Sequence, residues 1–566
     1  MEFVEHSEAK QDHFGSDVLH NATENRRSAN YKPNIWKYDF LQSLTSKYHN
    51  EEYGLRLDQR IHCVKEIFVE EKRGLAKLEL VDRIQKLGLA RHFQKEIKEV
   101  LDKILSTQNS ISSIEENRYL PALSFKLLRQ HGYKVSPDTV STFLADNGKV
   151  PENISEGSVK DILEILECSH LAFEGENILE KAKTLALSSL NCASEQMYGD
   201  LLEEVVHAVE LPSHWRVQWF DIKWYINHYE KQHHMDATLL NLAKLNFNII
   251  QANHQDEVKE LSGWWKILGL KEHLNFARDR LVECFMCAVG VASEPRYRSF
   301  RKWLTKAIKL VLVIDDVYDI YATFNELKHF TVAVEKWDDN EVQQLPKYMR
   351  ICFQALNDIT NETAFEIERE KNLALALVLP HLKKVVMDGL LQIIICRGKV
   401  VQRELYTIIA RISKQCLDFI IRPNHSNSFF AIMHEVTEGL GEFLNRNHDL
   451  IYNESLIIRL CNDLGTGVAE RERGDAASSI LCYMNEMSVS EEEARNHIKW
   501  MIRETWKKIN EECFTKMCSS RTFVSLTTNA ARVAHTLYQN GDGFGIQDRD
   551  IGRQILSLVI EPFLEV

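Results

Sequence analysis

The sequence predicts an all-α protein. Glycine and proline are scarce, with 23 and 10 among 566 residues, and segments rich in Leu, Glu, Lys and Ala dominate the chain. Apolar residues in these segments recur at spacings of three and four, which is typical of amphipathic helices. No stretch shows the strict alternation of an extended, sheet-forming chain. The length is sufficient for two or more domains, each with a full core.

The helical pattern changes along the chain and predicts three parts. Residues 1–25 have the composition of a flexible polar arm. From Trp36 to about Leu245, amphipathic stretches alternate with short polar breaks; within 76–105, for example, Gly88 is expected to end a helical turn. From about Ile249 onward the stretches are longer. We therefore predict an N-terminal helical domain over 26–245 and a C-terminal domain over 246–566, although no Pro/Gly linker marks the division.

Composition argues against several classes of protein. A formal net charge of -13 disfavours general nucleic-acid binding. No segment has 18 uncharged apolar residues, so no membrane span is expected. The 12 cysteines form no regular framework, which favours reduced thiols. The acidic N-terminus resembles neither a secretory signal nor a basic transit peptide, and the cytosol is the expected location.

Three carboxylates interrupt the apolar run over 310–324, which reads LVLVIDDVYDIYATF. On an α-helix Asp315 and Asp319 are four residues apart and share one face, whereas Asp316 is rotated away and is expected to support them. Two carboxylates on an apolar wall suit a hard divalent cation such as Mg²⁺. The alternative is a solvated helix face carrying three acids, because a lone short motif is weak evidence.

A second polar set lies in the stretch RLCNDLGTGVAERERGD, over 459–475. Asn462, Thr466 and Glu470 follow at intervals of four and form one helical stripe of amide, hydroxyl and carboxylate oxygens, which suits a second hard-ion site. Asp463 falls off that stripe. Gly465 and Gly467 make this a poor ordinary helix, which indicates a role other than helix stability.

Arginines accompany both acidic sets. Arg278 and Arg280 precede Asp315 by 37 and 35 residues, and Arg459 lies just before the second stripe. Guanidinium groups chelate phosphate oxygens, so arginines beside two metal sets indicate a metal–diphosphate site. Bound metal and arginine would draw charge from a leaving diphosphate. Taken alone, an Arg-Asp-Arg sequence is usually a surface salt-bridge cluster.

At these residues the chain resembles plant class I terpene synthases over nearly its whole length. IDDVYD resembles the family's DDxxD metal motif, NDLGTGVAE its (N/D)Dxx(S/T)xxxE motif and RDR its diphosphate-binding arginines, while RRSANYKPNIW from Arg26 to Trp36 resembles its tandem-arginine element. The resemblance implies an N-terminal α-barrel-like domain without its own active site and a C-terminal class I terpenoid synthase α-bundle. The DxDD motif of the other cyclase class is not found in this sequence.

The resemblance also implies residue roles. Asp315 and Asp319 would hold two Mg²⁺ ions, and Asn462, Thr466 and Glu470 a third, with Mn²⁺ as a possible substitute. The diphosphate of a prenyl substrate would be bound at these metals by Arg278, Arg280 and Arg459. Tyr538 and Asp542 match a catalytic aromatic–acid pair; a capped helix end with a polar loop explains them about equally well. A monomer is expected.

Within the family, six segments, among them FARDRLVECF and ARVAHTLYQNGDGFG, resemble the enzymes that make α-farnesene from farnesyl diphosphate. Cys287 stands where cyclising relatives often have an aromatic residue, and losing that ring fits an acyclic product. A small core thiol is the simpler explanation. Three alternatives stay open: a synthase making an ocimene-like product from geranyl diphosphate, a catalytically impaired family member, and a non-catalytic helical interaction module.

One segment departs from the family pattern. Where relatives have stretches resembling AKWY and WxSSSGP, residues 389–427 read GLLQIIICRGKVVQRELYTIIARISKQCLDFIIRPNHSN. Codons can be chosen for GKVVQ and LDFIIRP that, read one base later, encode AKWY and WISSSG. We therefore hypothesise that 389–427 is read out of frame and that the frame is restored before Phe429. A cDNA read with other codons would refute this hypothesis.

Overall fold

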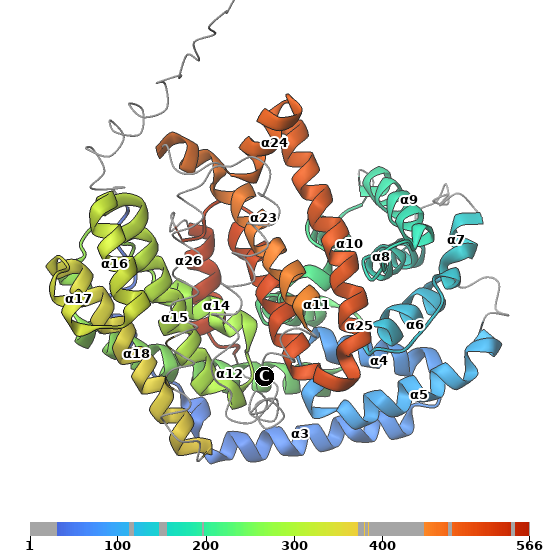
Figure 1. Ribbon diagram of the computed structural model, residues 1–566. Helices are drawn as coiled ribbons and strands as arrows, with labels where there is room; N and C mark the ends of the chain where they lie inside the picture. The colour runs from blue at the N-terminus through green and yellow to red at the C-terminus, as the bar shows by residue number, and fades with distance from the viewer. Residues whose placement is uncertain are drawn as a thin grey trace, which may run out of the picture.

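The computed structural model describes residues 31–111, 118–145, 156–194, 197–371, 379, 383, 447–473, 478–544 and 549–564. Throughout these ranges the regular structure is helical, which confirms the predicted fold class (Figure 1). The predicted arm over 1–25 and the suspected frame error over 389–427 lie outside the described residues.

The N-terminal half consists of short and medium helices. They are α2 (Tyr38–Ser43), α3 (Glu51–Glu70), α4 (Gly74–Lys86), α5 (Gln94–Ile111), α6 (Tyr119–Gln130), α7 (Ser141–Ala145), α8 (Glu156–Ser169), α9 (Asn177–Ser194), α10 (Asp200–Glu210) and α11 (Gln218–Lys231). Single 3-10 turns connect several of them: η1 (Lys47–His49), η2 (Ala90–His92), η3 (Pro137–Val140) and η4 (Ser213–Trp215).

The C-terminal half contains the longest helices. They are α12 (Ala237–Leu268), α13 (Leu270–His273), α14 (Leu281–Val291), α15 (Arg298–Asp316), α16 (Phe324–Lys336), α17 (Asp339–Gln343), α18 (Lys347–Lys371), α23 (His448–Arg473), α24 (Ser479–Met487), α25 (Glu491–Tyr538) and α26 (Arg549–Ile555). The 3-10 turn η5 (Pro295–Tyr297) precedes α15, and the π-helical turns η6 (Val317–Tyr321) and η7 (Leu556–Ile560) follow α15 and α26. The helices α14, α23 and α25 lie side by side in the middle of the molecule (Figure 1).

Gly88 ends α4, as the sequence predicts. Its φ of 69° lies in the left-handed region that glycine tolerates best. The amide of Leu89 then donates back to the carbonyl of Ile84 at 2.9 Å, which satisfies a carbonyl at the helix end. A Cβ at position 88 would also meet the end of the Ile222 side chain on α11, which would have to move aside.

The helix α12 joins the two halves. It runs unbroken for 32 residues, from the Asp236 N-cap, whose side chain accepts from Leu239, to Gly269, whose φ is 66°. The predicted division between 245 and 246 therefore falls inside a helix, where no break in sequence could mark it. One hydrophobic cluster extends from Trp36 to Phe563 and includes both halves, so the halves share a core. The exact domain limits stay a prediction.

Amide side chains of α12 bind the C-terminal segment. Gln251 donates to the carbonyl of Leu558 at 3.1 Å, and Gln255 to that of Val559 at 3.0 Å. Asn248 exchanges two hydrogen bonds with the backbone of Phe563, at 3.0 and 2.8 Å. These side chains are buried, so the bonds satisfy polar groups on both partners and fix the chain end against α12 (Figure 1).

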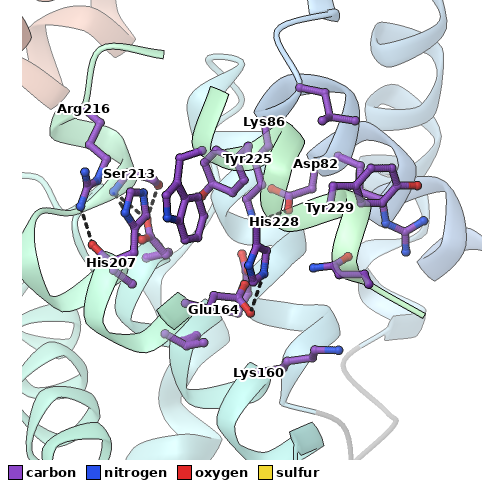
Figure 2. Close-up of a pocket in the computed structure, with 18 of the residues that line it drawn as sticks. Asp82, Lys86, Lys160, Glu164, His207, Ser213, Arg216, Tyr225, His228 and Tyr229 are labelled. Atoms are coloured by element: carbon purple, nitrogen blue, oxygen red, sulfur yellow. Dashed lines mark hydrogen bonds and ion pairs between the residues drawn. The ribbon is translucent and has the colours of Figure 1, made fainter. Parts of the chain in front are cut away.

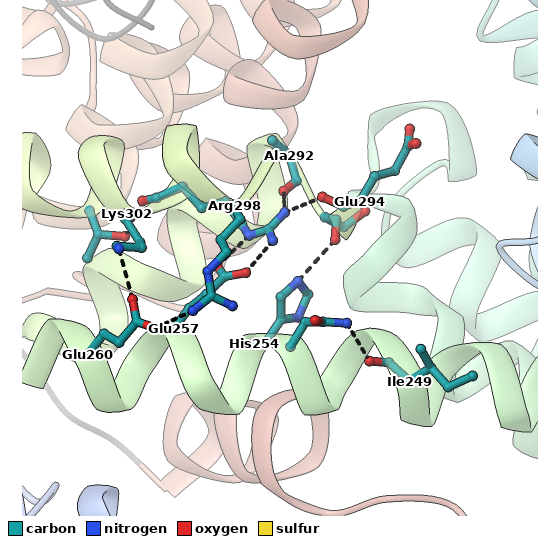
Figure 3. A network of polar contacts seen from close by, with 12 residues as sticks. Ile249, His254, Glu257, Glu260, Ala292, Glu294, Arg298 and Lys302 are labelled. Atoms are coloured by element: carbon teal, nitrogen blue, oxygen red, sulfur yellow. Dashed lines mark hydrogen bonds and ion pairs between the residues drawn. The ribbon is translucent and has the colours of Figure 1, made fainter. Parts of the chain in front are cut away.

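A buried ion pair connects α12 to α15 (Figure 3). Arg301 and Glu257 have 0% side-chain exposure, and the Nε of Arg301 lies 2.8 Å from Oε2 of Glu257. The same guanidinium donates to the carbonyl of Ala292 at 2.7 Å, and His254 lies 3.0 Å from the carbonyl of Ser293. The network thereby fixes the connection between α14 and α15. Arg278 and Arg280 lie just before α14, and Asp315 lies near the end of α15.

A polar cavity of about 180 Å³ lies among α4, α8, α10 and α11 in the N-terminal half (Figure 2). Buried Lys126 sits between Asp82 and Glu164, at 2.8 and 2.7 Å, and Lys86 forms a second ion pair with Asp82 at 2.8 Å. Burial alone would raise the pKa of Asp82, but the two lysines lower it; for Glu164 burial prevails and raises the pKa. The charges along this wall thus neutralise one another and hold the helices together.

The described helices include none long and apolar enough to cross a membrane. Every described cysteine is a free thiol. Cys284 and Cys287 have the spacing of a CxxC pair but lie buried in α14 as unlinked thiols.

Candidate active site

The predicted aspartates lie where α15 passes into a π-helical turn. The α-helix ends at Asp316, and η6 continues from Val317 to Tyr321. The α-helical i, i+4 geometry predicted for Asp315 and Asp319 is therefore wrong beyond Asp316. Asp319 lies within η6, and its side chain is outside the described part of the structure. Single π-helical turns frequently mark functional sites.

Asp316 is a buried supporting residue, as the sequence predicts, and it holds Arg278. Its side chain is 0% exposed, and its Oδ2 accepts from the backbone amide of Arg278 at 2.7 Å. Its Oδ1 lies 2.9 Å from Nε of Arg278. Burial raises the pKa of Asp316 even though Arg278 opposes the shift. Asp315, by contrast, keeps 31% exposure and pairs with the terminal guanidinium nitrogen of Arg278 at 2.8 Å.

A buried lysine outside the predicted set of site residues holds the loop that carries Arg278. Lys309 is 0% exposed and donates to the backbone carbonyl of Arg278. Its ammonium lies 4.3 Å from the ring centre of Trp265, and that indole donates to Asp279 at 3.0 Å. Burial lowers the pKa of Lys309. The signal was available, since Lys309 is a charged residue within the apolar run that precedes Asp315.

Arg280 points away from the aspartates. Its Nε donates to the carbonyl of Phe544 at 2.9 Å, and its two terminal nitrogens donate to the carbonyls of Asp279 and Lys32, both at 3.1 Å. The predicted pair of arginines thus separates in the structure: Arg278 faces Asp315 and Asp316, and Arg280 faces backbone.

The second polar stripe lies on α23. Thr466 is buried and donates its hydroxyl proton to the carbonyl of Asn462 at 2.8 Å. The side chain of Glu470 is outside the described part of the structure. Asp463, expected to fall off the stripe, is fully buried: it accepts from the backbone of Ser479 at 2.9 Å and pairs with Arg459 at 2.7 Å. Asp463 therefore anchors α24 to α23.

Tyr538 at the end of α25 lies between the residues around Arg278 and the polar stripe on α23. Burial and the carboxylate of Asp542 raise the pKa of Tyr538, while a hydrogen bond with Asn462 opposes the shift. Arg278 and Cys287 also lie close enough to influence this phenol. Asp542 in turn acts with Asp316 and Asp315 to raise the pKa of Arg278 against the effect of burial. Residues from α14, α15, α23 and α25 thus converge on one site.

Gly465 permits this convergence. A Cβ at this position would lie 2.8 Å from the carbonyl oxygen of Gly541 and 3.0 Å from Cβ of Tyr538. The first of these neighbours is a backbone atom and the second is the Cβ of the Tyr538 side chain, so neither can rotate away. The glycine that makes α23 a poor ordinary helix is therefore required by the close approach of α25.

We expect Gly465→Ala to lower turnover by about tenfold or more, because a shift of the Tyr538–Gly541 segment by even about 1 Å misplaces the site. Helical propensity alone predicts the opposite direction for stability, since alanine stabilises a helix interior by about 1 kcal/mol relative to glycine. Gly467→Ala is the matched control, because a Cβ there meets nothing closer than 3.6 Å. Steady-state kinetics on both variants checks the prediction, and equal activities would contradict it.

The described oxygens fit a hard divalent cation. They are a half-exposed carboxylate on Asp315, an amide on Asn462 and a hydroxyl on Thr466, which are ligand types that Mg²⁺ accepts. Among the described side chains no three His, Cys, Asp or Glu residues gather as a metal site. A full set of ligands would need the carboxylates of Asp319 and Glu470.

Comparison with known proteins gives matches over both halves. Residues 35–209 match the terpene synthase N-terminal domain, and residues 266–508 match the terpene synthase family metal binding domain. An alpha-farnesene synthase of Ricinus communis is 50% identical over 95% of this chain and 96% of its own length. An (E,E)-alpha-farnesene synthase of Malus domestica is also 50% identical, over 95% of this chain and 94% of its own.

Solved structures agree with the fold. Limonene synthase with 2-fluorolinalyl diphosphate superposes with a TM-score of 0.86 at 34% identity, covering 95% of this chain and 100% of that one. Isoprene synthase from grey poplar, in complex with three Mg²⁺ ions and dimethylallyl-S-thiolodiphosphate, gives 0.79 at 36% identity over 94% and 99%. With both halves matched and the metal motifs on converging helices, the chain belongs to the terpene synthase family.

Proposed function

We propose that the protein is a sesquiterpene synthase that converts farnesyl diphosphate into (E,E)-α-farnesene and inorganic diphosphate. The observation that carries the proposal is the meeting of Arg278, Asp315, Asn462 and Tyr538 at one site. The choice of product rests on 50% identity to two relatives named as α-farnesene synthases.

The proposed binding roles follow from charge. Asp315, Asp319, Asn462, Thr466 and Glu470 would hold Mg²⁺, and we propose three ions. Bound Mg²⁺ would neutralise the diphosphate and make it a better leaving group. Arg278 would bind diphosphate oxygens through the guanidinium that now pairs with Asp315 at 2.8 Å. Arg459 would assist from α23, one turn before Asn462.

The chemistry requires ionisation and loss of one proton. The C1–O bond of the substrate breaks, and its electron pair leaves with the diphosphate. The resulting allylic cation then loses a proton from C4, which gives the conjugated diene. The raised pKa keeps Tyr538 as a neutral phenol, so it would orient groups through Asn462 rather than accept the proton. Asp542 or the departing diphosphate would take the proton.

A monoterpene synthase acting on geranyl diphosphate is the competing function within the same chemistry, and the assay below separates the two. The cytosolic location and the monomeric state remain predictions. A fluorescent fusion and light scattering would test them.

The decisive experiment compares two forms of the protein: the chain as written, and the chain with 389–427 replaced by the peptide of the shifted frame. Each form receives farnesyl or geranyl diphosphate with Mg²⁺, and volatile products are identified by gas chromatography–mass spectrometry. We expect α-farnesene from the reframed form. Product from both forms would show that 389–427 is tolerated, and a product only from geranyl diphosphate would contradict the proposed substrate. No product from either form would contradict the proposed function.

A further inference from the structure

Arg280 connects three distant parts of the chain through backbone carbonyls. Its acceptors are Phe544, Lys32 and its own neighbour Asp279, at 2.9, 3.1 and 3.1 Å. Its side chain is fully buried. Three of the five guanidinium N–H groups of Arg280 thus donate to backbone carbonyls of the protein, which leaves at most two for any other acceptor.

The N-terminal partner is the segment 31–36, and neighbouring contacts hold it in the same place. Trp36 donates its indole N–H to Oε1 of buried Glu283 at 3.1 Å. The ring of Tyr31 lies 5.1 Å from the guanidinium carbon of Arg278. Segment 31–36 therefore lies across the start of α14, and Arg280 binds its backbone at the carbonyl of Lys32.

The C-terminal partner is the turn 541–544, which carries Asp542. The amide of Phe544 donates to Oδ1 of Asp542 at 3.0 Å, while Arg280 holds the carbonyl of the same Phe544. The turn is tight: a Cβ on Gly543 would lie 2.5 Å from the carbonyl oxygen of Leu537. A residue that fixes Phe544 therefore fixes the carboxylate that faces Tyr538 and Arg278.

We infer that Arg280 is a positioning residue that binds segment 31–36 and turn 541–544 to the start of α14, and that Arg278 alone of the two binds diphosphate. The inference replaces the expectation that both arginines bind the leaving group. Its second half rests on the proposed function, whereas its first half rests on contacts within the protein.

The test is hydrogen–deuterium exchange on the full-length chain, combined with titration of inorganic diphosphate in the presence of Mg²⁺. The variants are Arg280→Lys and Arg278→Lys, which keep the charge and remove the planar fork of donors. For Arg280→Lys we expect faster exchange in peptides covering both 31–36 and 541–544, and a diphosphate affinity within about twofold of the parent. For Arg278→Lys we expect an affinity at least about tenfold weaker, because lysine cannot bind two oxygens in parallel.

Several outcomes would overturn the inference. One is a loss of affinity in Arg280→Lys that equals the loss in Arg278→Lys. Another is unchanged exchange in both segments. If Arg280→Lys does not fold, Trp36→Phe tests whether segment 31–36 and turn 541–544 are held by separate contacts, because it removes the indole donor to Glu283 and leaves Arg280 in place: exchange should rise in 31–36 and stay unchanged in 541–544, and any other pattern contradicts the inference. A parent that binds no diphosphate would refute the proposed function, while the exchange data would still decide the role of Arg280.

Discussion

Asp315→Asn is expected to lower the rate of diphosphate release by about a thousandfold or more, which corresponds to about 4 kcal/mol of lost transition-state stabilisation. Asparagine keeps the shape of the side chain but removes the charge that a cation requires. The fold should survive, because Asp315 is 31% exposed and Arg278 retains its contacts with Asp316. Asp319→Asn should have an effect of the same size, since its predicted role is the same.

Asp316→Asn provides the contrast that separates chemistry from folding. Asp316 is fully buried, accepts from the backbone amide of Arg278 and forms an ion pair with its guanidinium, so removing its charge should lower stability as well as activity. Asp339→Asn on α17 is the surface control, because that residue is exposed. Diphosphate release, measured across a Mg²⁺ titration on whichever form is active, checks the prediction. Activity of Asp315→Asn within tenfold of the parent would contradict the metal role.

The sequence predicted the features that depend on residue type and spacing. The all-α fold followed from apolar periodicity, and the helix end at Gly88 followed from the preference of glycine for positive φ. Asp316 and Asp463 were separated from their neighbours by helical angle alone, and both are buried supports in the structure. Each lies one position away from a predicted metal ligand, Asp315 or Asn462, and this one-residue shift places it on a different face of the helix.

Other features have no sequence signature. The π-helical turn over 317–321 depends on which carbonyl each amide selects, and residue identity does not determine that choice. Arg280 donates to the backbone carbonyls of Lys32 and Phe544. Every residue has a backbone carbonyl, so no sequence motif predicts these contacts. The same reason explains why Arg280 was grouped with Arg278. The sequence does not predict that α12 is continuous. The helices before about residue 245 differ in length from those after it, but α12 itself runs across this change.

The buried pair of Glu257 and Arg301 gives the largest expected effect on stability. We expect Arg301→Met to lower the free energy of unfolding by about 3–5 kcal/mol, since it leaves a carboxylate without its partner in the core. Two backbone carbonyls, of Ala292 and Glu294, lose their donor in the same variant. The connection between α14 and α15 then loses its main support, so activity should fall together with stability.

The pKa of Glu257 decides how a double variant behaves. Burial raises this pKa although Arg301 opposes the shift, so ionising the carboxylate in the folded protein carries a desolvation cost that the pair does not fully offset. An acid whose folded pKa lies above its unfolded value loses stability as the pH rises through that range. Glu257→Gln should therefore recover part of the loss in an Arg301→Met background, and the recovery should be larger at pH 8 than at pH 5.

The exposed pair of Arg298 and Glu260 is the matched control, because it joins the same two helices with 39% and 44% side-chain exposure (Figure 3). Arg298→Met should cost less than about 1 kcal/mol, since solvent screens an exposed pair. Urea unfolding followed by far-ultraviolet circular dichroism measures the parent and the three variants. Equal losses for Arg298→Met and Arg301→Met would mean that burial does not set the energy of these pairs. A double variant no more stable than Arg301→Met would mean that the lost carbonyl contacts, rather than the stranded charge of Glu257, account for the effect.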